Sequence, residues 1–116
     1  MKTNLQLEPL LAATSRTPAD RSALFAVFAL GVIELLTNGL LSANDAVRYF
    51  FHAENCLFVR KHLRGKVADQ IMSHGVQLPD LFDMLPADEA QREYQRELAT
   101  MRSLCLKLLG DKQRVA

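Results

Sequence analysis

An uncharged run of residues between 22 and 33 places the strongest constraint on how this chain can fold. Apolar side chains surround the expected helix from Ala23 to Leu36 on nearly every side, which leaves little room for a face in water. A helix of this kind is surrounded by protein or lies at an interface. The run is shorter than the roughly 20 apolar residues of a membrane span. If the run is extended to residue 43, Glu34 falls near its middle. A charged residue there costs about 2.5 to 3.5 kcal/mol of insertion free energy, so we expect no membrane segment.

The composition is that of a globular protein with one domain. The 116 residues are enough for a single hydrophobic core, and 49% of them are hydrophobic against 23% charged. The 14 basic and 13 acidic side chains leave a net charge of +1, so no overall field attracts the protein to nucleic acid or to an anionic membrane. Cys56 and Cys105 both fall in apolar helical patterns, and the acids Glu8 and Asp20 before the apolar run do not fit a secretory leader. We expect a cytoplasmic protein with free thiols.

Capping residues and helix breakers divide the chain into helices. Thr17, Pro18 and Asp20 have the residue types of a helix start, and Asn38 with Gly39 those of a helix end. These signals predict a long helix over 18–37. By the same reasoning we expect shorter helices over 43–51, 53–63 and 66–74 and a second long helix over 86–109.

No window of the sequence shows the period-two alternation typical of a strand. The predicted fold class is therefore all-α: a compact bundle of about five helices, two of them long. We expect Gly75 and Gly110 to end helices, with a single helical turn after Pro79. The predicted organisation is an N-terminal arm over 1–16 that is partly ordered, a single helical domain over 17–110 and a C-terminal tail over 111–116.

The chain carries more apolar surface than one small bundle is expected to hide. The helix over 86–109 has a main apolar stripe, made of Tyr94, Leu98, Met101, Cys105 and Leu108. Beside this stripe it has Leu104, Leu106 and Leu109, and the leucines of the N-terminal arm also need cover. We therefore predict a non-catalytic, bacterial-type helical module that binds protein, first of all a second copy in an isologous dimer; another protein as partner stays open. Gly31 costs its helix about 1 kcal/mol relative to alanine, which predicts close approach of another helix, within the fold or across the dimer. The candidate contact residues are Phe25, Phe28, Val32, Leu104 and Leu108.

A basic cluster provides an alternative. Arg60, Lys61, Arg64 and Lys66 come without an intervening acid, and clustered basic side chains bind phosphates. The alternative function is a nucleic-acid-binding regulator that uses these four residues. Basic residues also belong in the last turn of a helix, where they meet the negative end of its dipole. In a helix-turn-helix arrangement the acid Glu54 would face the phosphates, so we do not expect nucleic acid as a partner.

A third pattern is formed by His52, Glu54 and Cys56, in which His52 and Cys56 stand one helical turn apart. This arrangement could serve a small metal or thiol enzyme. A zinc site needs three or four ligands, and the sequence places no further ligand nearby, so we predict no metal, no cofactor and no catalysis. Glu34 could be a buried carboxyl with a raised pKa, but the polar residues one turn further on favour an exposed position.

Overall fold

The all-α prediction is confirmed by the computed structural model, which describes residues 4–14, 17–63 and 65–115. Within these ranges the chain forms six helices and no strand, where the sequence predicted about five helices. The helices are α1 (Leu7–Thr14), α2 (Pro18–Thr37), α3 (Ala43–Tyr49), α4 (Ala53–His62), α5 (Val67–Met84) and α6 (Ala87–Val115).

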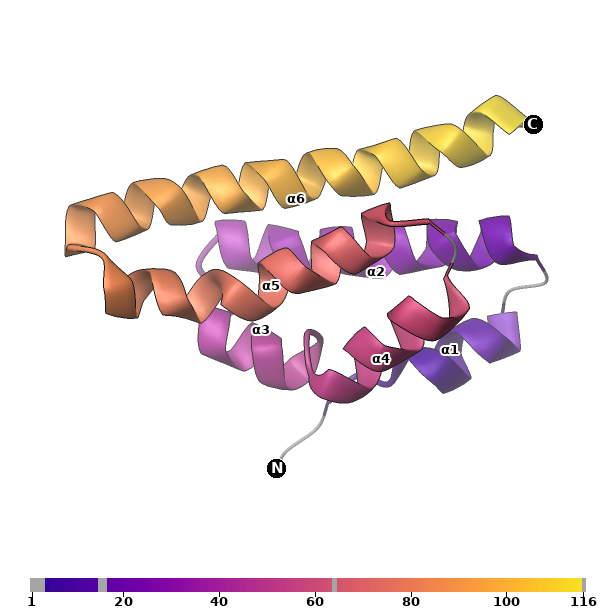
Figure 1. Ribbon diagram of the computed structural model, residues 1–116, viewed down its shortest axis with the longest axis horizontal. Helices are drawn as coiled ribbons and strands as arrows, with labels where there is room; N and C mark the ends of the chain where they lie inside the picture. The colour runs from indigo at the N-terminus through magenta and orange to yellow at the C-terminus, as the bar shows by residue number, and fades with distance from the viewer. Residues whose placement is uncertain (1–3, 15–16, 64, 116) are drawn as a thin grey trace.

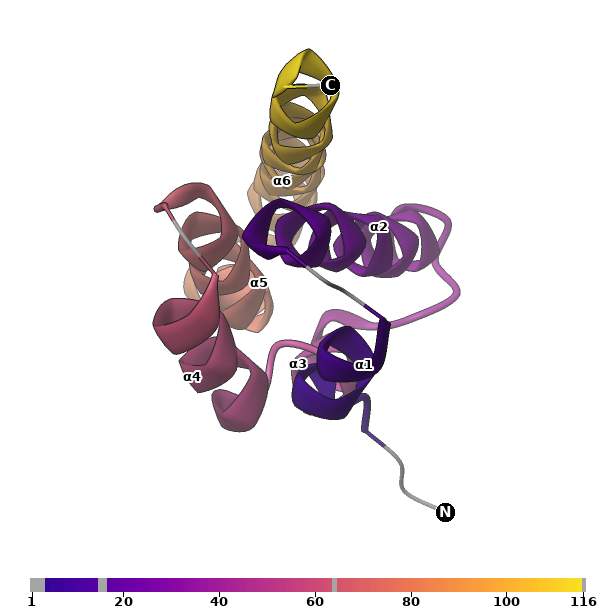
Figure 2. The ribbon, with the colours of Figure 1, turned by 90° about the vertical axis from the view of Figure 1, so that its right-hand side faces the viewer.

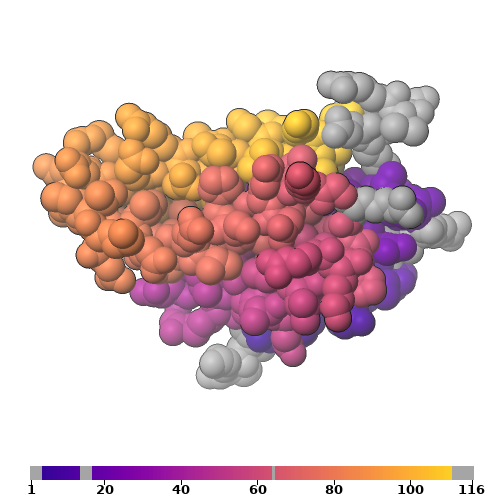
Figure 3. Space-filling model, in the orientation of Figure 1, coloured from indigo at the N-terminus to yellow at the C-terminus, as the bar shows by residue number. Residues whose placement is uncertain are grey.

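The helices lie in three layers (Figures 1 and 2). One outer layer is α6, which packs on α2 and α5 in the middle layer, and α1, α3 and α4 form the other outer layer. In the space-filling view the side chains of α4 and α5 occupy the middle of the face turned to the viewer, and those of α6 lie along its upper part (Figure 3). The helix α2 is thus covered by α6, by α5 and by α1 with α3. Its remaining side faces right in Figure 2, where the described chain places no helix against it.

Capping side chains set the starts of α2 and α3 where the sequence predicted them. Thr17 Oγ1 accepts a hydrogen bond of 3.0 Å from the Asp20 N–H, and Ser42 Oγ accepts one of 3.1 Å from the Asp45 N–H. Gly39, just after α2, has a φ of 72°, the left-handed conformation that glycine adopts without strain. The predicted helix over 18–37 is confirmed at both ends.

The prediction that Gly75 ends a helix is wrong. The helix α5 continues through Gly75 and Pro79, in place of the separate helix over 66–74 and the single turn expected after it. A Cβ atom on Gly75 would lie 2.4 Å from Cδ1 of Phe51, so the residue is glycine because the Phe51 ring lies against the α5 backbone. Pro79 has no N–H to donate to the Gly75 carbonyl. The helix continues past it because the apolar residues of its inner face are buried, namely Ile71, Met72 and Leu78.

Gly110 does not end its helix either. The helix α6 runs on to Val115, so residues 111–115, which we expected to form a tail, continue it. A glycine lowers helix stability by about 1 kcal/mol, which is too little to end a helix whose preceding turns are held by packing. The apolar stripe predicted on this helix is buried as a whole, at Tyr94, Leu98, Met101, Cys105 and Leu108.

Part of the segment over 1–16 packs into the core as α1, with Leu7 and Leu11 fully buried. The side chain of Asn55, on α4 and only 1% exposed, holds this segment in place. Its Oδ1 accepts a hydrogen bond from the Leu7 N–H (3.0 Å). Its Nδ2 donates to the carbonyls of Leu5 (2.9 Å) and Phe50 (2.8 Å). One carboxamide therefore satisfies three backbone groups from two distant parts of the chain.

Asn55→Ala should destabilise the protein by about 2 to 4 kcal/mol, because the Leu7 N–H and the Phe50 carbonyl would lose their side-chain partner in a buried site and the Leu5 carbonyl would keep only its contact with His52. Urea unfolding followed by circular dichroism measures this change. Asn44→Ala, at an exposed asparagine of α3, is the matched control and should change the free energy of unfolding by less than about 0.5 kcal/mol. Equal changes in the two variants would contradict the role given to Asn55.

Gly75→Ala should destabilise the protein by about 2 to 3 kcal/mol, because the new methyl group forces the Phe51 ring out of its packed position. Gly31→Ala is the matched change on α2, where a Cβ would meet no atom within 4 Å. It should raise the stability of the single molecule by about 0.5 to 1 kcal/mol. Thermal unfolding at low protein concentration measures the change in stability of both variants. A loss of stability in Gly31→Ala would show that another element approaches this glycine.

Candidate functional site

The outer side of α2 carries an apolar surface, which we call the α2 face. It consists of Leu24, Val27, Phe28, Gly31 and Leu35, at spacings that place them on one side of a helix. Val27 is 53% exposed and Leu35 38%, and Gly31 is also exposed. Leu24 and Phe28 are half-buried and pack against the core. Apolar side chains that gather on one exposed helix face make this face a candidate interaction surface.

A neutralised pair lies beside the α2 face. Glu34, which the sequence placed in an exposed position, is exposed as expected. Its Oε2 accepts a hydrogen bond from Asn38 Nδ2 (2.9 Å), and its Oε1 accepts one from Arg102 Nη2 of α6 (3.0 Å). The pKa of this carboxyl lies below its ordinary value. The hydrogen bond from Asn38 is the largest cause, followed by the hydrogen bond from Arg102 and the positive charge of Arg102. The single charged residue between Arg21 and Asn38 on α2 is therefore balanced within the molecule.

Gly31 stands in the middle of the α2 face. A Cβ atom on it would meet no atom within 4 Å. Of the two explanations that the sequence offered for this glycine, the close approach of another helix within the fold finds no support in the described residues. Approach of a helix from a second molecule remains.

The structure divides the five contact residues predicted from the sequence. Phe25, Val32 and Leu108 belong to the core of the single molecule, at 0%, 5% and 9% exposed. Phe28 and Leu104 are half-buried, with part of each side chain at the surface. Periodicity predicted which helices are apolar, but the side of α2 that turns outward depends on where α1, α3 and α6 pack, and the sequence did not indicate this.

The basic residues predicted for nucleic acid are largely engaged or lie apart. Arg60 Nε lies 3.6 Å from Asp69 Oδ1. Lys61 borders a surface hollow that also contains Glu8 and Glu54. Lys66 is the exposed N-cap residue of α5, and Arg64 lies outside the described residues. Of the described members of the cluster, Arg60 and Lys61 therefore have acidic neighbours.

The residues of the predicted third pattern hold the backbone together. His52 Nε2 lies 2.8 Å from the Leu5 carbonyl oxygen, and Nδ1 accepts a hydrogen bond of 3.4 Å from the Asn55 N–H, so both ring nitrogens contact backbone groups. Cys56 Sγ donates to the Phe51 carbonyl (3.7 Å). Across the part of the chain that the structure covers, no three histidine, cysteine or acidic side chains come together as metal ligands.

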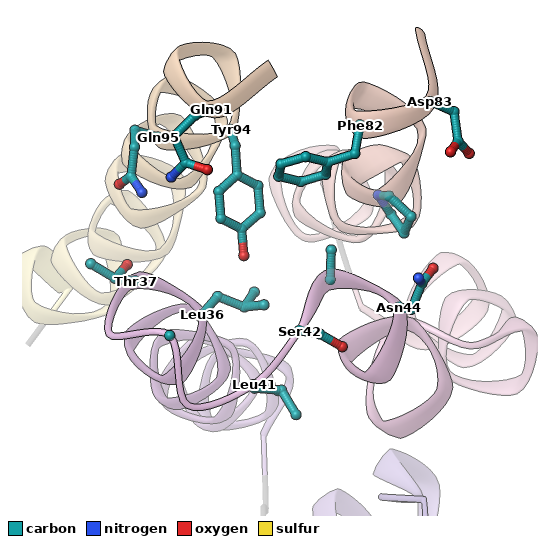
Figure 4. A pocket seen from close by; sticks show the side chains of 13 residues that line it. Leu36, Thr37, Leu41, Ser42, Asn44, Phe82, Asp83, Gln91, Tyr94 and Gln95 are labelled. Atoms are coloured by element: carbon teal, nitrogen blue, oxygen red, sulfur yellow. The ribbon is translucent and has the colours of Figure 1, made fainter. Parts of the chain in front are cut away.

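A pocket of about 510 Å³ opens at the end of the bundle, between the α2–α3 turn, α5 and α6 (Figure 4). Its wall is of mixed polarity. Apolar parts come from Leu36, Leu41, Ala43, Pro79 and Phe82, and polar parts from Thr37, Ser42, Asn44, Asp83, Gln91, Tyr94 and Gln95, with Gly39 between them. We call it the Tyr94 pocket. Sequence reasoning missed it, because its residues come from three separate segments.

Tyr94 is the most buried polar side chain of this pocket. Only 8% of the residue is exposed, and burial raises the pKa of its phenol. Its ring lies 5.1 Å from that of Phe82 in an edge-on arrangement. In the sequence Tyr94 was one member of an apolar stripe. Its hydroxyl was a signal that this position needs a polar neighbour or water.

No family model, no curated protein and no solved structure matches this chain. None of the helices in the described ranges has the length and hydropathy to cross a membrane. The α2 face and the Tyr94 pocket are therefore the two features of the molecule that bear on its function.

The two cysteines should differ in reactivity. Cys105 is fully buried and burial raises the pKa of its thiol to about 12; burial also raises the pKa of Cys56, which is half-buried. Since the thiolate is the reactive form, DTNB at pH 8 should modify Cys56 slowly and Cys105 only after unfolding. In Cys56→Ser the native protein should release no thionitrobenzoate. Rapid modification of that variant would contradict the burial of Cys105.

Proposed function

We propose that this protein is a non-catalytic binding module that associates with a second copy of itself through the α2 face. The observation that carries the proposal is an exposed apolar helix face with a glycine at its centre. No packing contact within the single molecule requires a glycine at this position. Such a glycine permits two helices to approach closely, and helix pairs pack at about 8 to 10 Å.

The arrangement we propose is an isologous dimer with its two-fold axis beside Gly31, where α2 crosses α2 of the partner in antiparallel fashion. Val27 and Leu35 both lie four residues from Gly31, so Val27 of one copy would be opposite Leu35 of the other. A two-fold axis makes every contact twice. This symmetry is the reason why a single short apolar stripe can serve as a complete interface.

Charge supports the same arrangement. The pair of Glu34 with Arg102 (3.0 Å) is neutralised within each copy, so the approach of two identical faces does not place unpaired like charges against each other. Leu106, 54% exposed on α6, adds apolar surface on the helix that packs against α2. The proposal therefore includes the adjoining side of α6 at the edge of the interface.

Size indicates how strong this dimer is. The 12 residues from Leu24 to Leu35 span about 18 Å, and with the adjoining side of α6 the surface is about 20 Å wide, or about two helix diameters, which gives about 360 Å² on each copy. Stable interfaces bury about 800 Å² on each partner. We therefore propose a weak dimer with a dissociation constant in the micromolar range, which forms and separates readily.

The proposal also includes the cellular compartment. We propose that the protein acts in the cytoplasm, because Cys56 and Cys105 are both free thiols and such thiols suit a reducing compartment.

Nucleic-acid binding through the basic cluster is the alternative. The contact of Arg60 with Asp69 (3.6 Å) and the acidic neighbours of Lys61 do not favour it.

Gly31→Leu should abolish the dimer and leave the fold intact, since leucine favours a helix and has open space at this position. Sedimentation velocity from 5 to 200 µM should give a concentration-dependent dimer for the wild type and a monomer for the variant. Val27→Lys should have the same effect, because it places two charges in an apolar contact.

Leu57→Lys is the matched control for Val27→Lys. Leu57 is 50% exposed on α4, away from the α2 face, and the variant should dimerise like the wild type. A wild-type protein that stays monomeric at 200 µM would overturn self-association. Dimerisation of Gly31→Leu at wild-type strength would show that another surface is used.

A further inference from the structure

The hydroxyl of Tyr94 has an unusual position. The residue is more than nine-tenths buried, and no hydrogen bond joins its hydroxyl to any of the described residues. The hydroxyl oxygen is not fully enclosed, since none of the described side chains leaves a fully buried nitrogen or oxygen atom unpaired. It therefore reaches the pocket surface, where water or a ligand is its hydrogen-bond partner. In Figure 4 the hydroxyl points from α6 into the pocket, toward the α2–α3 turn. A molecule in the pocket can supply the missing partner.

The charge of the wall selects against anions. Asp83 is the only lining residue with a charge, and the described chain brings no lysine or arginine into this wall. In Figure 4 the Asp83 carboxylate points away from the Tyr94 hydroxyl. An anionic ligand would find no opposite charge to replace its hydration. An uncharged molecule loses less hydration free energy than an anion when it enters the pocket.

The remaining groups indicate the shape of the ligand. Asn44, Gln91 and Gln95 line the pocket with carboxamides, each of which offers both donors and acceptors. Phe82 is 45% exposed and presents an aromatic surface beside Tyr94. Proteins hold planar bases by stacking on aromatic rings and by hydrogen bonds to the base edges. The pocket has the groups for both.

We propose that the Tyr94 pocket binds an uncharged planar heterocycle with hydrogen-bonding edges, of nucleobase or nucleoside size, and that the Tyr94 hydroxyl hydrogen-bonds to it. The pocket volume of about 510 Å³ lies within the range of about 300 to 1,000 Å³ that small-molecule sites occupy. This site is separate from self-association, since none of the five residues of the α2 face lines the pocket.

The test is a titration of the ¹⁵N-labelled protein with adenosine, guanosine, cytidine and uridine up to 5 mM, followed by amide chemical shifts. At least one nucleoside should give saturable shifts confined to the α2–α3 turn, the end of α5 and the start of α6. Orotate, a pyrimidine that carries a carboxylate, should give none. Gly31→Leu should bind like the wild type, which separates this proposal from the dimer.

Tyr94→Phe removes the hydroxyl alone. Because the hydroxyl has no partner in the described chain, the variant should keep its melting temperature within about 2 °C and bind about five- to tenfold more weakly. Tyr49→Phe is the matched control, at the other tyrosine, and should bind like the wild type. Gln95→Leu should also weaken binding, as it removes a carboxamide from an exposed helix position.

Three results would overturn the proposal. The first is the absence of saturable shifts with all four nucleosides at 5 mM. The second is binding by Tyr94→Phe at wild-type strength. The third is a marked fall in the melting temperature of Tyr94→Phe, which would show that the hydroxyl serves the fold rather than a ligand.

Discussion

The structure depends on the burial of α2 by the other helices, because α2 is apolar on nearly every side. The remaining helices are arranged around it, with α6 on one side, α5 beside it, and α1 and α3 on the other. Phe25, Ala29 and Ile33 are fully enclosed by this packing. Three sides are enough to hold the helix in a stable core, and the fourth side is left as the α2 face. Stability and the self-association that we propose thus depend on the same apolar helix.

The attachment of the N-terminal segment completes this cover. The helix α1 has only eight residues, and a helix of that length is marginal in water by itself. Its position depends on two buried leucines and on the hydrogen bonds that Asn55 and His52 make to residues 5–7. The pattern of His52, Glu54 and Cys56 suggested a metal site in the sequence. In the structure His52 contacts the distant Leu5 carbonyl, and Glu54 accepts a hydrogen bond from the Gln6 side chain (2.9 Å). Cys56 bonds only to the nearby Phe51 carbonyl.

Local signals predicted the helices well and their continuity poorly. The start of α2 at Thr17 and the start of α3 at Ser42 could be predicted because a capping side chain bonds to a backbone group only three residues away. At Gly75 the residue type predicts a helix end, but glycine also permits close contact with a neighbouring side chain. Only the position of the Phe51 ring, 24 residues earlier in the chain, distinguishes the two. Pro79 misled in the same way, because burial of the helix face outweighed a lost hydrogen bond.

The sequence by itself determined the all-α class, the central apolar helix and the surplus of apolar surface, since these depend on composition and on spacings within a few residues. It also indicated that Gly31 needed an explanation beyond helix formation. Only the tertiary structure decided which side of α2 turns outward and which residues surround Tyr94. Both depend on the packing angles of whole helices, which bring together α2, α5 and α6 from distant parts of the chain. Packing of this kind is a property of the assembled core, and no local pattern of residues encodes it.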